Sequence, residues 1–185
     1  MNSKYSFLFV FLFIFIGCKE DVLPKPKAML RLDYPNEASK GLETDCYYGF
    51  EYNQMAKMES KENCSLTLDY PNMKGSIFIT YKKVDGDLNT LLSDAQKLSY
   101  EHAVKADNII EQPFINANEK VYGMFYEVKG DAASQAQFYV TDSINHFVTG
   151  SLYFYAKPNY DSIFPAAIYL QKDVRRVMET FKWKE

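Results

Sequence analysis

The sequence predicts an α+β domain in which an antiparallel β-sheet is covered by helices. Three observations support this fold class: residues 120–155 hold three alternating, strand-like stretches, short connections join them, and one helical stretch precedes them and another follows. Short connections favour antiparallel neighbours, because a parallel crossover needs a dozen or more residues. We expect residues 29–185 to form this single globular domain.

Short strands are predicted at the start of the domain. Leu30–Asn36 alternates apolar and polar residues before a Pro-Asn turn, and Leu66–Asn72 repeats that pattern. Cys46–Tyr52 is aromatic and strand-like, and a hairpin with residues 57–66 is a hypothesis that would bring Cys46 and Cys64 opposite each other across the ladder. Ser76–Lys82 is rich in β-branched and aromatic residues, which predicts a further strand.

A helix is predicted over Leu88–Lys105, after a turn at Val84–Asp87. Apolar or small residues, together with one histidine, recur there at helical spacing: Leu88, Leu91, Leu92, Ala95, Leu98, Ser99, His102 and Ala103. Asp87 is expected to cap this helix, its carboxylate accepting hydrogen bonds from the free amides of the first turn. We expect His102 to be a partly buried, hydrogen-bonded member of this face, not a ligand or a catalyst.

A three-stranded meander and a closing helix are predicted for the rest of the chain. The strands cover about 120–128, 135–141 and 146–155. The helix has Pro165 near its first turn, and one face is apolar: Ile163, Ala167, Leu170, Val174, Val177, Met178 and Phe181. This order of elements resembles the Mog1/PsbP-type α/β/α sandwich. The resemblance concerns the fold alone and implies a binding or assembly module without fixing one activity.

The first residues form a leader. Lys4 precedes ten consecutive apolar residues, Phe7–Ile16, as in a secretory signal. Ten residues rise only about 15 Å as a helix, while a bilayer core is roughly 30 Å thick. Gly17 and Cys18 end the run and resemble the lipobox of bacterial lipoproteins. That resemblance implies a signal peptide cleaved after residue 17, a diacylglycerol on the Cys18 thiol and an acyl chain such as palmitate on the new amine. An ordinary signal peptide with an incidental cysteine and an uncleaved anchor are the alternatives.

Residues 18–28 are expected to be a lipid anchor and an extended tether. Pro24 and Pro26 favour a polyproline conformation. Residues 19–21 (Lys-Glu-Asp) resemble the short signal that moves lipoproteins of gliding bacteria to the cell surface, and the alternative is a merely solvated start of the tether. We expect the anchor in the cell envelope, in the outer rather than the inner membrane. Whether the domain faces the periplasm or the surface stays open.

The composition argues against nucleic acid as a partner. The 185 residues carry a net charge of −3, and arginine, which binds phosphates best, occurs only as Arg31, Arg175 and Arg176. The same acidic balance argues against binding to an anionic membrane surface. The 15 tyrosines and 14 phenylalanines either pack on both faces of a sheet or form an interaction surface, and we favour packing.

Cys46 and Cys64 remain once Cys18 is set aside. In an exported protein such a pair forms a disulfide more often than two free thiols. Buried free thiols are the alternative, and the sequence leaves both open. No Cys-x-x-Cys spacing is present, so neither a redox motif nor a zinc site is indicated.

Metal-binding and phosphate-binding motifs are not found in the sequence. His102 and His146 are too few for a histidine-built metal centre, and Asp85 and Asp87 lack the further ligands of a calcium loop. The glycines are scattered and form no phosphate-binding loop. We expect no cofactor, no metal and no small-molecule substrate.

Asp142, Ser143 and His146 contain the members of a hydrolase triad. They are crowded into one tight turn, whereas triad members normally come together from separate elements. Turn formation therefore explains them better than catalysis, and we expect no enzymatic activity.

Four stretches, in this order, carry a family resemblance: Ile16–Asp21, Leu23–Lys27, Leu30–Pro35 and Phe181–Trp183. Together they resemble the gliding-motility lipoproteins of the GldD family over essentially the whole chain. The resemblance implies a membrane-anchored lipoprotein needed for surface gliding and for the linked type 9 secretion machinery, with no known catalytic activity. It implies contacts with the membrane through the lipid and with other lipoproteins of that machinery. Only Cys18 carries over as a residue of defined role.

Two other functions remain as alternatives to an assembly or scaffold protein. A small-molecule or glycan-binding module would show a concave, tyrosine-lined pocket. An unrecognised hydrolase would show clustered titratable groups in a cleft.

Overall fold

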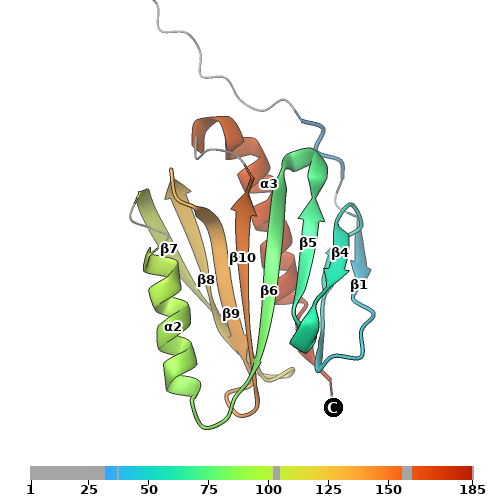
Figure 1. Cartoon of the computed structure of the whole chain (residues 1–185), viewed down its shortest axis with the longest axis vertical. Coiled ribbons are helices and arrows are strands. Elements are labelled where there is room, and N and C mark those ends of the chain that lie inside the picture. The colour runs from blue at the N-terminus through green and yellow to red at the C-terminus, as the bar shows by residue number, and fades with distance from the viewer. Residues whose placement is uncertain (1–31, 37, 102–104, 156–159, 185) are drawn as a thin grey trace, which may run out of the picture.

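The structure is a computed structural model that describes residues 32–36, 38–101, 105–155 and 160–184 (Figure 1). The expected signal peptide, Cys18, the expected tether, the first two residues of the expected N-terminal strand (Leu30 and Arg31) and His102 lie outside the described residues.

A seven-stranded antiparallel sheet organises the described chain, with the strand order β4-β5-β6-β10-β9-β8-β7. Its strands are β4 (Lys57–Ser60), β5 (Leu66–Tyr70), β6 (Gly75–Lys83), β7 (Ala106–Asn116), β8 (Val121–Gly130), β9 (Ser134–Thr141) and β10 (His146–Phe154). Helices α2 (Leu88–Glu101) and α3 (Tyr160–Glu179) lie on opposite faces of the sheet, α2 in front and α3 behind in Figure 1. The predicted α+β class, the sandwich of sheet and helices and the β8-β9-β10 meander are confirmed.

The larger core lies between the sheet and α3. Side chains alternate along each strand, so Ile77, Phe138 and Leu152 point to one face, where Leu170 and Val174 of α3 belong to the same buried cluster. Burial of each such side chain contributes about 1.5–3 kcal/mol. This cluster is therefore the main source of stability in the domain.

A smaller core lies under α2 on the other face. Leu91 and Ala95 pack against Phe147 of β10. One turn further along α2, the Ser99 hydroxyl donates to the Gln137 side-chain oxygen of β9 over 3.1 Å. The helix is thus held by a short apolar contact and one buried polar contact.

The N-terminal segment forms two small ladders, one within itself and one with the C-terminal end of the described chain. β1 (Ser39–Gly41) pairs with β3 (Glu51–Asn53), and β2 (Tyr48–Gly49) pairs with β11 (Lys182–Trp183). The second ladder brings two segments together that are more than a hundred residues apart in the sequence. It places the rings of Tyr48 and Phe181 5.3 Å apart.

The expected N-terminal pairing is wrong in two respects. Residues 32–36 form no strand: the Tyr34 ring lies 5.4 Å from the Tyr169 ring, and the Tyr169 hydroxyl donates to the Pro35 carbonyl. The expected hairpin of 46–52 with 57–66 does not form either, because β2 pairs with β11 while β4 pairs with β5. Distant partners override the local strand pattern in both cases.

Strand β7 is absent from the sequence prediction. Pro113 lies within it, and a proline is tolerated in a sheet only where its missing N–H faces no neighbouring strand. β7 is the edge strand next to β8, so alternate N–H groups along it face no strand and a proline can be accommodated there. The register is also irregular between Ala106 and Asn108, which hides the alternation at its start.

The starts of both helices differ from the expectation. The Asp87 carboxylate accepts the backbone N–H of Asp85, outside α2, while the Asp87 carbonyl accepts from Thr90 and Leu91. Helix α3 begins at Tyr160, whose N–H donates to the Asp131 carboxylate, so Pro165 lies in its second turn. The cap of α3 comes from the distant β8-β9 connection, which the local sequence does not reveal.

Candidate binding site

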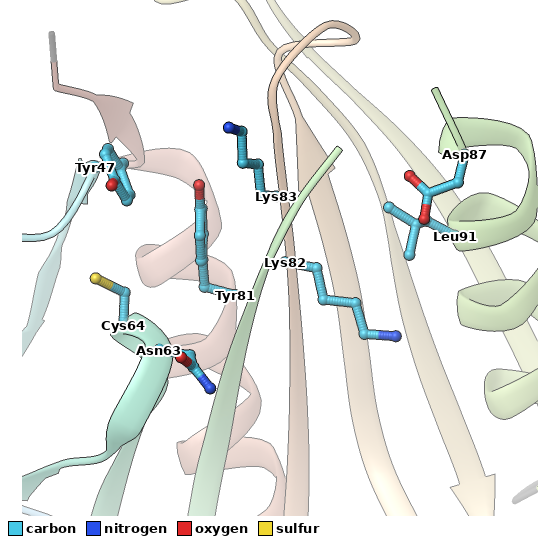
Figure 2. A pocket seen from close by; sticks show the side chains of 8 residues that line it. All are labelled: Tyr47, Asn63, Cys64, Tyr81, Lys82, Lys83, Asp87 and Leu91. Carbon is cyan, nitrogen blue, oxygen red and sulfur yellow. The ribbon is translucent and has the colours of Figure 1, made fainter. Parts of the chain in front are cut away.

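The open side of β6 forms the candidate site. β10 pairs with β6 over Gly75–Lys83, whereas β5 pairs only with Gly75–Ile79. In the described chain no strand lies beside residues 80–83 on the β5 side. A hollow of about 610 Å³ lies there (Figure 2), and we call it the edge notch. Its lining residues are Tyr47, Asn63, Cys64, Tyr81, Lys82, Lys83, Asp87 and Leu91.

An aromatic stack forms one wall of the edge notch. The Tyr47 ring stacks on Tyr81, with centroids 5.5 Å apart, and on His146 at 5.4 Å. The Trp183 ring also stacks on the His146 ring, with centroids 5.3 Å apart. The Tyr81 hydroxyl oxygen and His146 Nδ1 are 2.8 Å apart. Tyr47 is 52 % exposed, so an aromatic face is available at the mouth of the notch.

Polar groups of the edge notch differ in charge and direction. Successive side chains of a strand alternate in direction, and Figure 2 shows Lys82 pointing toward Asp87 and Leu91 while Lys83 points to the side of the tyrosines. Burial first, and then the charges of Tyr47 and Asp142, raise the pKa of the Tyr81 hydroxyl. Tyr81 therefore remains a neutral hydrogen-bonding group at neutral pH, and the two lysines give the notch a positive balance over Asp87.

A disulfide supports the far wall of the edge notch. Cys46 and Cys64 are bonded, with their Cα atoms 5.6 Å apart. The Tyr48 hydroxyl donates to the Cys64 carbonyl next to this bond. The bond ties the loop that carries Tyr47 to the loop at η2 (Glu62–Cys64), which are the two loops facing β6. It links two loops and not two strands of a hairpin.

Loss of this disulfide is expected to lower the free energy of unfolding by up to about 3 kcal/mol. The bond closes a loop across a sequence separation of 18 residues, and closing such a loop restricts the unfolded chain. Urea unfolding of the chain with and without reductant measures the difference. In the Cys46→Ser/Cys64→Ser double variant, reductant should change nothing. Equal stability of the wild-type chain in both conditions would contradict the assignment.

The three residues of the apparent triad build a turn. The Asp142 carboxylate accepts the backbone N–H groups of Ile144, Asn145 and His146 over 2.8–2.9 Å. Burial acts to raise the pKa of the Asp142 carboxyl, but these three donors outweigh it and hold the pKa below its usual range. Ser143 adopts a left-handed backbone with φ 68° and is exposed. The carboxylate therefore stabilises the turn backbone, while the His146 ring contacts Tyr81.

Comparison with known protein families decides the family. The family model described as "Gliding motility lipoprotein GldD" matches residues 19–183, nearly the whole chain. The chain belongs to the GldD family. No curated protein sequence matches it. The match includes every residue of the edge notch and bears out the resemblance seen in the sequence.

The described residues of this GldD family member show neither a grouped set of metal ligands nor a helix that could cross a membrane. Over residues 32–36, 38–101, 105–155 and 160–184, no three His, Cys, Asp or Glu side chains are grouped to hold a metal ion. In the turn before α2, the Asp85 backbone N–H donates to the Asp87 carboxylate. Neither described helix is long and apolar enough to cross a membrane.

The edge notch of this GldD family member was not foreseen from the sequence. Its aromatic stack combines Tyr47, Tyr81, His146 and Trp183, which come from four segments separated along the chain. Each of these residues has an ordinary structural explanation when its segment is considered alone. The two cysteines, Asp87 and His146 are the residues singled out in the sequence that lie at this region.

Proposed function

We propose that the chain is a membrane-anchored, non-enzymatic lipoprotein that gliding motility and the linked type 9 secretion machinery require. It acts in assembly or as a scaffold that contacts other lipoproteins of that machinery. The observation that carries the proposal is the match of residues 19–183 to the gliding motility lipoprotein family GldD. Cys18, the residue before the match, is the proposed lipid attachment site, after cleavage of residues 1–17.

The position of the edge notch supports a role in contacting partners. The first described residues, blue in Figure 1, lie at the end of the sheet where β6 begins. The edge notch lies where β6 ends, at the opposite end of this strand. A tether that joins the domain before residue 32 therefore positions the notch at the end of the domain opposite to the anchor. We place the anchor in the outer membrane, and the domain on its periplasmic or its outer side.

Cys18→Ser tests the proposal. The variant is expected to leave the membrane fraction and to lose gliding and type 9 secretion, because stable attachment requires two or more acyl chains. Fractionation, intact mass, colony spreading and secretion of a cargo protein are measured together. Adding an unrelated membrane anchor to the variant should restore motility. A Cys18→Ser protein that stays membrane-bound in cells that glide and secrete normally would contradict the proposal.

A small-molecule or glycan-binding module is the second candidate. The observation in its favour is that the edge notch is concave and partly lined by Tyr47 and Tyr81, with stacked rings. Such rings can pack against the apolar face of a sugar. Titration with soluble oligosaccharides, comparing the wild type with Tyr47→Ala, would detect this activity. Tight binding of a soluble ligand without any envelope partner would place this candidate first.

A further inference from the structure

The last residues of β6 direct backbone groups into the edge notch. The Val84 N–H donates to the Asn145 carbonyl on the β10 side over 2.8 Å. Neighbouring residues of a strand point their backbone groups to opposite sides, so the N–H and C=O of Lys83 point away from β10. Tyr81 points the same way, and its N–H donates to the Ser65 hydroxyl over 3.3 Å. The edge therefore offers the Lys83 N–H and the carbonyls of Tyr81 and Lys83 to the notch.

The chain itself turns away from this edge. Asn63 and Cys64 adopt left-handed backbone conformations, with φ of 54° and 58°, just before β5. The hydrogen bond from Lys61 N–H to the Ser65 carbonyl closes the same loop. This loop and the disulfide to Cys46 stand across from residues 80–83 without pairing with them. The space between is the hollow of about 610 Å³.

We propose that the edge notch binds an extended acidic segment of a partner protein, which adds as a short β-strand beside residues 80–83. The proposal rests on the proposed function for the identity of the partner, a protein of the motility and secretion machinery. Four residues of β6 give the added strand about 13 Å of edge. Main-chain hydrogen bonds supply affinity in this mode, and pockets for alternate side chains supply specificity.

Charge and ring positions define the chemistry of the added segment. Lys82 and Lys83 are exposed beside the edge, while Asp87 is the one acidic residue among the lining residues. Carboxylates on the added strand would therefore be attracted to the notch. The exposed face of Tyr47 fits a β-branched or aromatic side chain at an alternate position.

The two outer edges of the main sheet fit this role less well. β7 carries Glu111 and Pro113, and acidic residues or a proline on an edge strand discourage pairing with another chain. β4 has only four residues, all exposed, and the hollow that its Met58 shares with the β1-β3 ladder is lined by a single aromatic ring, Tyr52. The edge at residues 80–83 is recessed and has an aromatic wall, which favours a specific partner over random pairing.

Selection from a displayed library of random octapeptides on the purified full-length chain tests the proposal. Enriched peptides are expected to alternate acidic with β-branched or aromatic residues. The best peptide is then synthesised and titrated against Lys83→Pro and its matched control Lys83→Ala. Lys83→Pro removes the N–H that faces the notch and leaves the β6-β10 ladder intact. We expect it to weaken binding roughly tenfold, the loss of about one hydrogen bond. Lys83→Ala should weaken binding less, and Lys83→Glu should weaken it for acidic peptides in particular.

A second measurement does not depend on the folding of any variant. N-methylation of the peptide amides that face β6 should abolish binding, and N-methylation of the alternating amides should not. No enriched peptide, equal binding to Lys83→Pro and Lys83→Ala, or equal effects of both methylation patterns would each overturn strand addition. Occupation of the notch by an oligosaccharide in place of the peptide would also overturn it. The two proposals fail separately, because normal gliding of the Cys18→Ser strain rejects the proposed function and leaves the peptide measurement unaffected.

Discussion

Asp173→Ala is expected to lower the free energy of unfolding by about 3–5 kcal/mol, because it removes one partner of a buried charged network. Asp173 of α3 is 1 % exposed. Its carboxylate accepts the Asn53 side-chain N–H₂ over 3.0 Å and lies 3.7 Å from an Arg176 nitrogen. The same Asn53 amide donates to the Tyr169 hydroxyl. Truncation leaves the Asn53 donor and the Arg176 charge without this carboxylate.

The network matters because it fixes β3 to α3. Asn53 is the last residue of β3, and the Tyr169 hydroxyl continues the connection to the Pro35 carbonyl. The network also includes Tyr70 of β5, because burial first, and then the charge of Asp173, raise the pKa of the Tyr70 hydroxyl. We therefore expect loss of Asp173 to loosen the whole N-terminal segment.

Urea unfolding measures the effect of Asp173→Ala, and hydrogen exchange around Asn53 locates it. Asp173→Asn, which keeps the shape and one acceptor, is the matched control and should destabilise the chain less. A change below about 1 kcal/mol for Asp173→Ala, in the range of an exposed ion pair, would contradict this account.

Gly150→Ala is expected to destabilise the domain by about 3 kcal/mol through overpacking. Gly150 of β10 lies directly opposite Phe138 of β9. A Cβ atom at this glycine would clash with Cε1 of the Phe138 ring. Phe138 is 2 % exposed and packed within the larger core, so the ring cannot move aside without disturbing its neighbours.

Two further variants make the Gly150 prediction specific. Gly41→Ala is the matched control, because a Cβ at Gly41 meets no atom within 4 Å, and its effect should stay within about 0.5 kcal/mol. Combining Gly150→Ala with Phe138→Leu should cost less than the sum of the two single changes, because the smaller side chain makes room. Full additivity in thermal and urea unfolding would show that the ring does not cause the effect.

Much of the fold follows from local patterns in the sequence. The alternation in β8 and β10 identifies these strands, because their alternate side chains face opposite sides of the sheet, and the apolar stripes identify α2 and α3, because each helix packs on one face of the sheet. β7 escapes the same reasoning because it is an edge strand with Pro113 and an irregular start. The N-terminal segment also escapes it, because Tyr34 and Tyr48 find their partners on α3 and beside β11.

The candidate site follows from the sequence to a smaller degree. The acidic turn at Asp142 could be interpreted from its own residues, since its hydrogen bonds are local. The edge notch could not, because its open edge arises from the different lengths of β5 and β6. Strand lengths depend on where neighbouring loops turn, and here the left-handed residues Asn63 and Cys64 set that point.

The β2-β11 ladder has a consequence for the order of events during synthesis. Tyr48 and Phe50 emerge from the ribosome early, yet the ring of Phe181 that stacks on both of them is made more than a hundred residues later. Until then these two rings lack a packing partner that they have in the finished domain. Contacts between such distant residues form slowly, since a long loop must close first. The aromatic surface of Tyr48 and Phe50 is therefore completed only when the last segment of the chain docks on it.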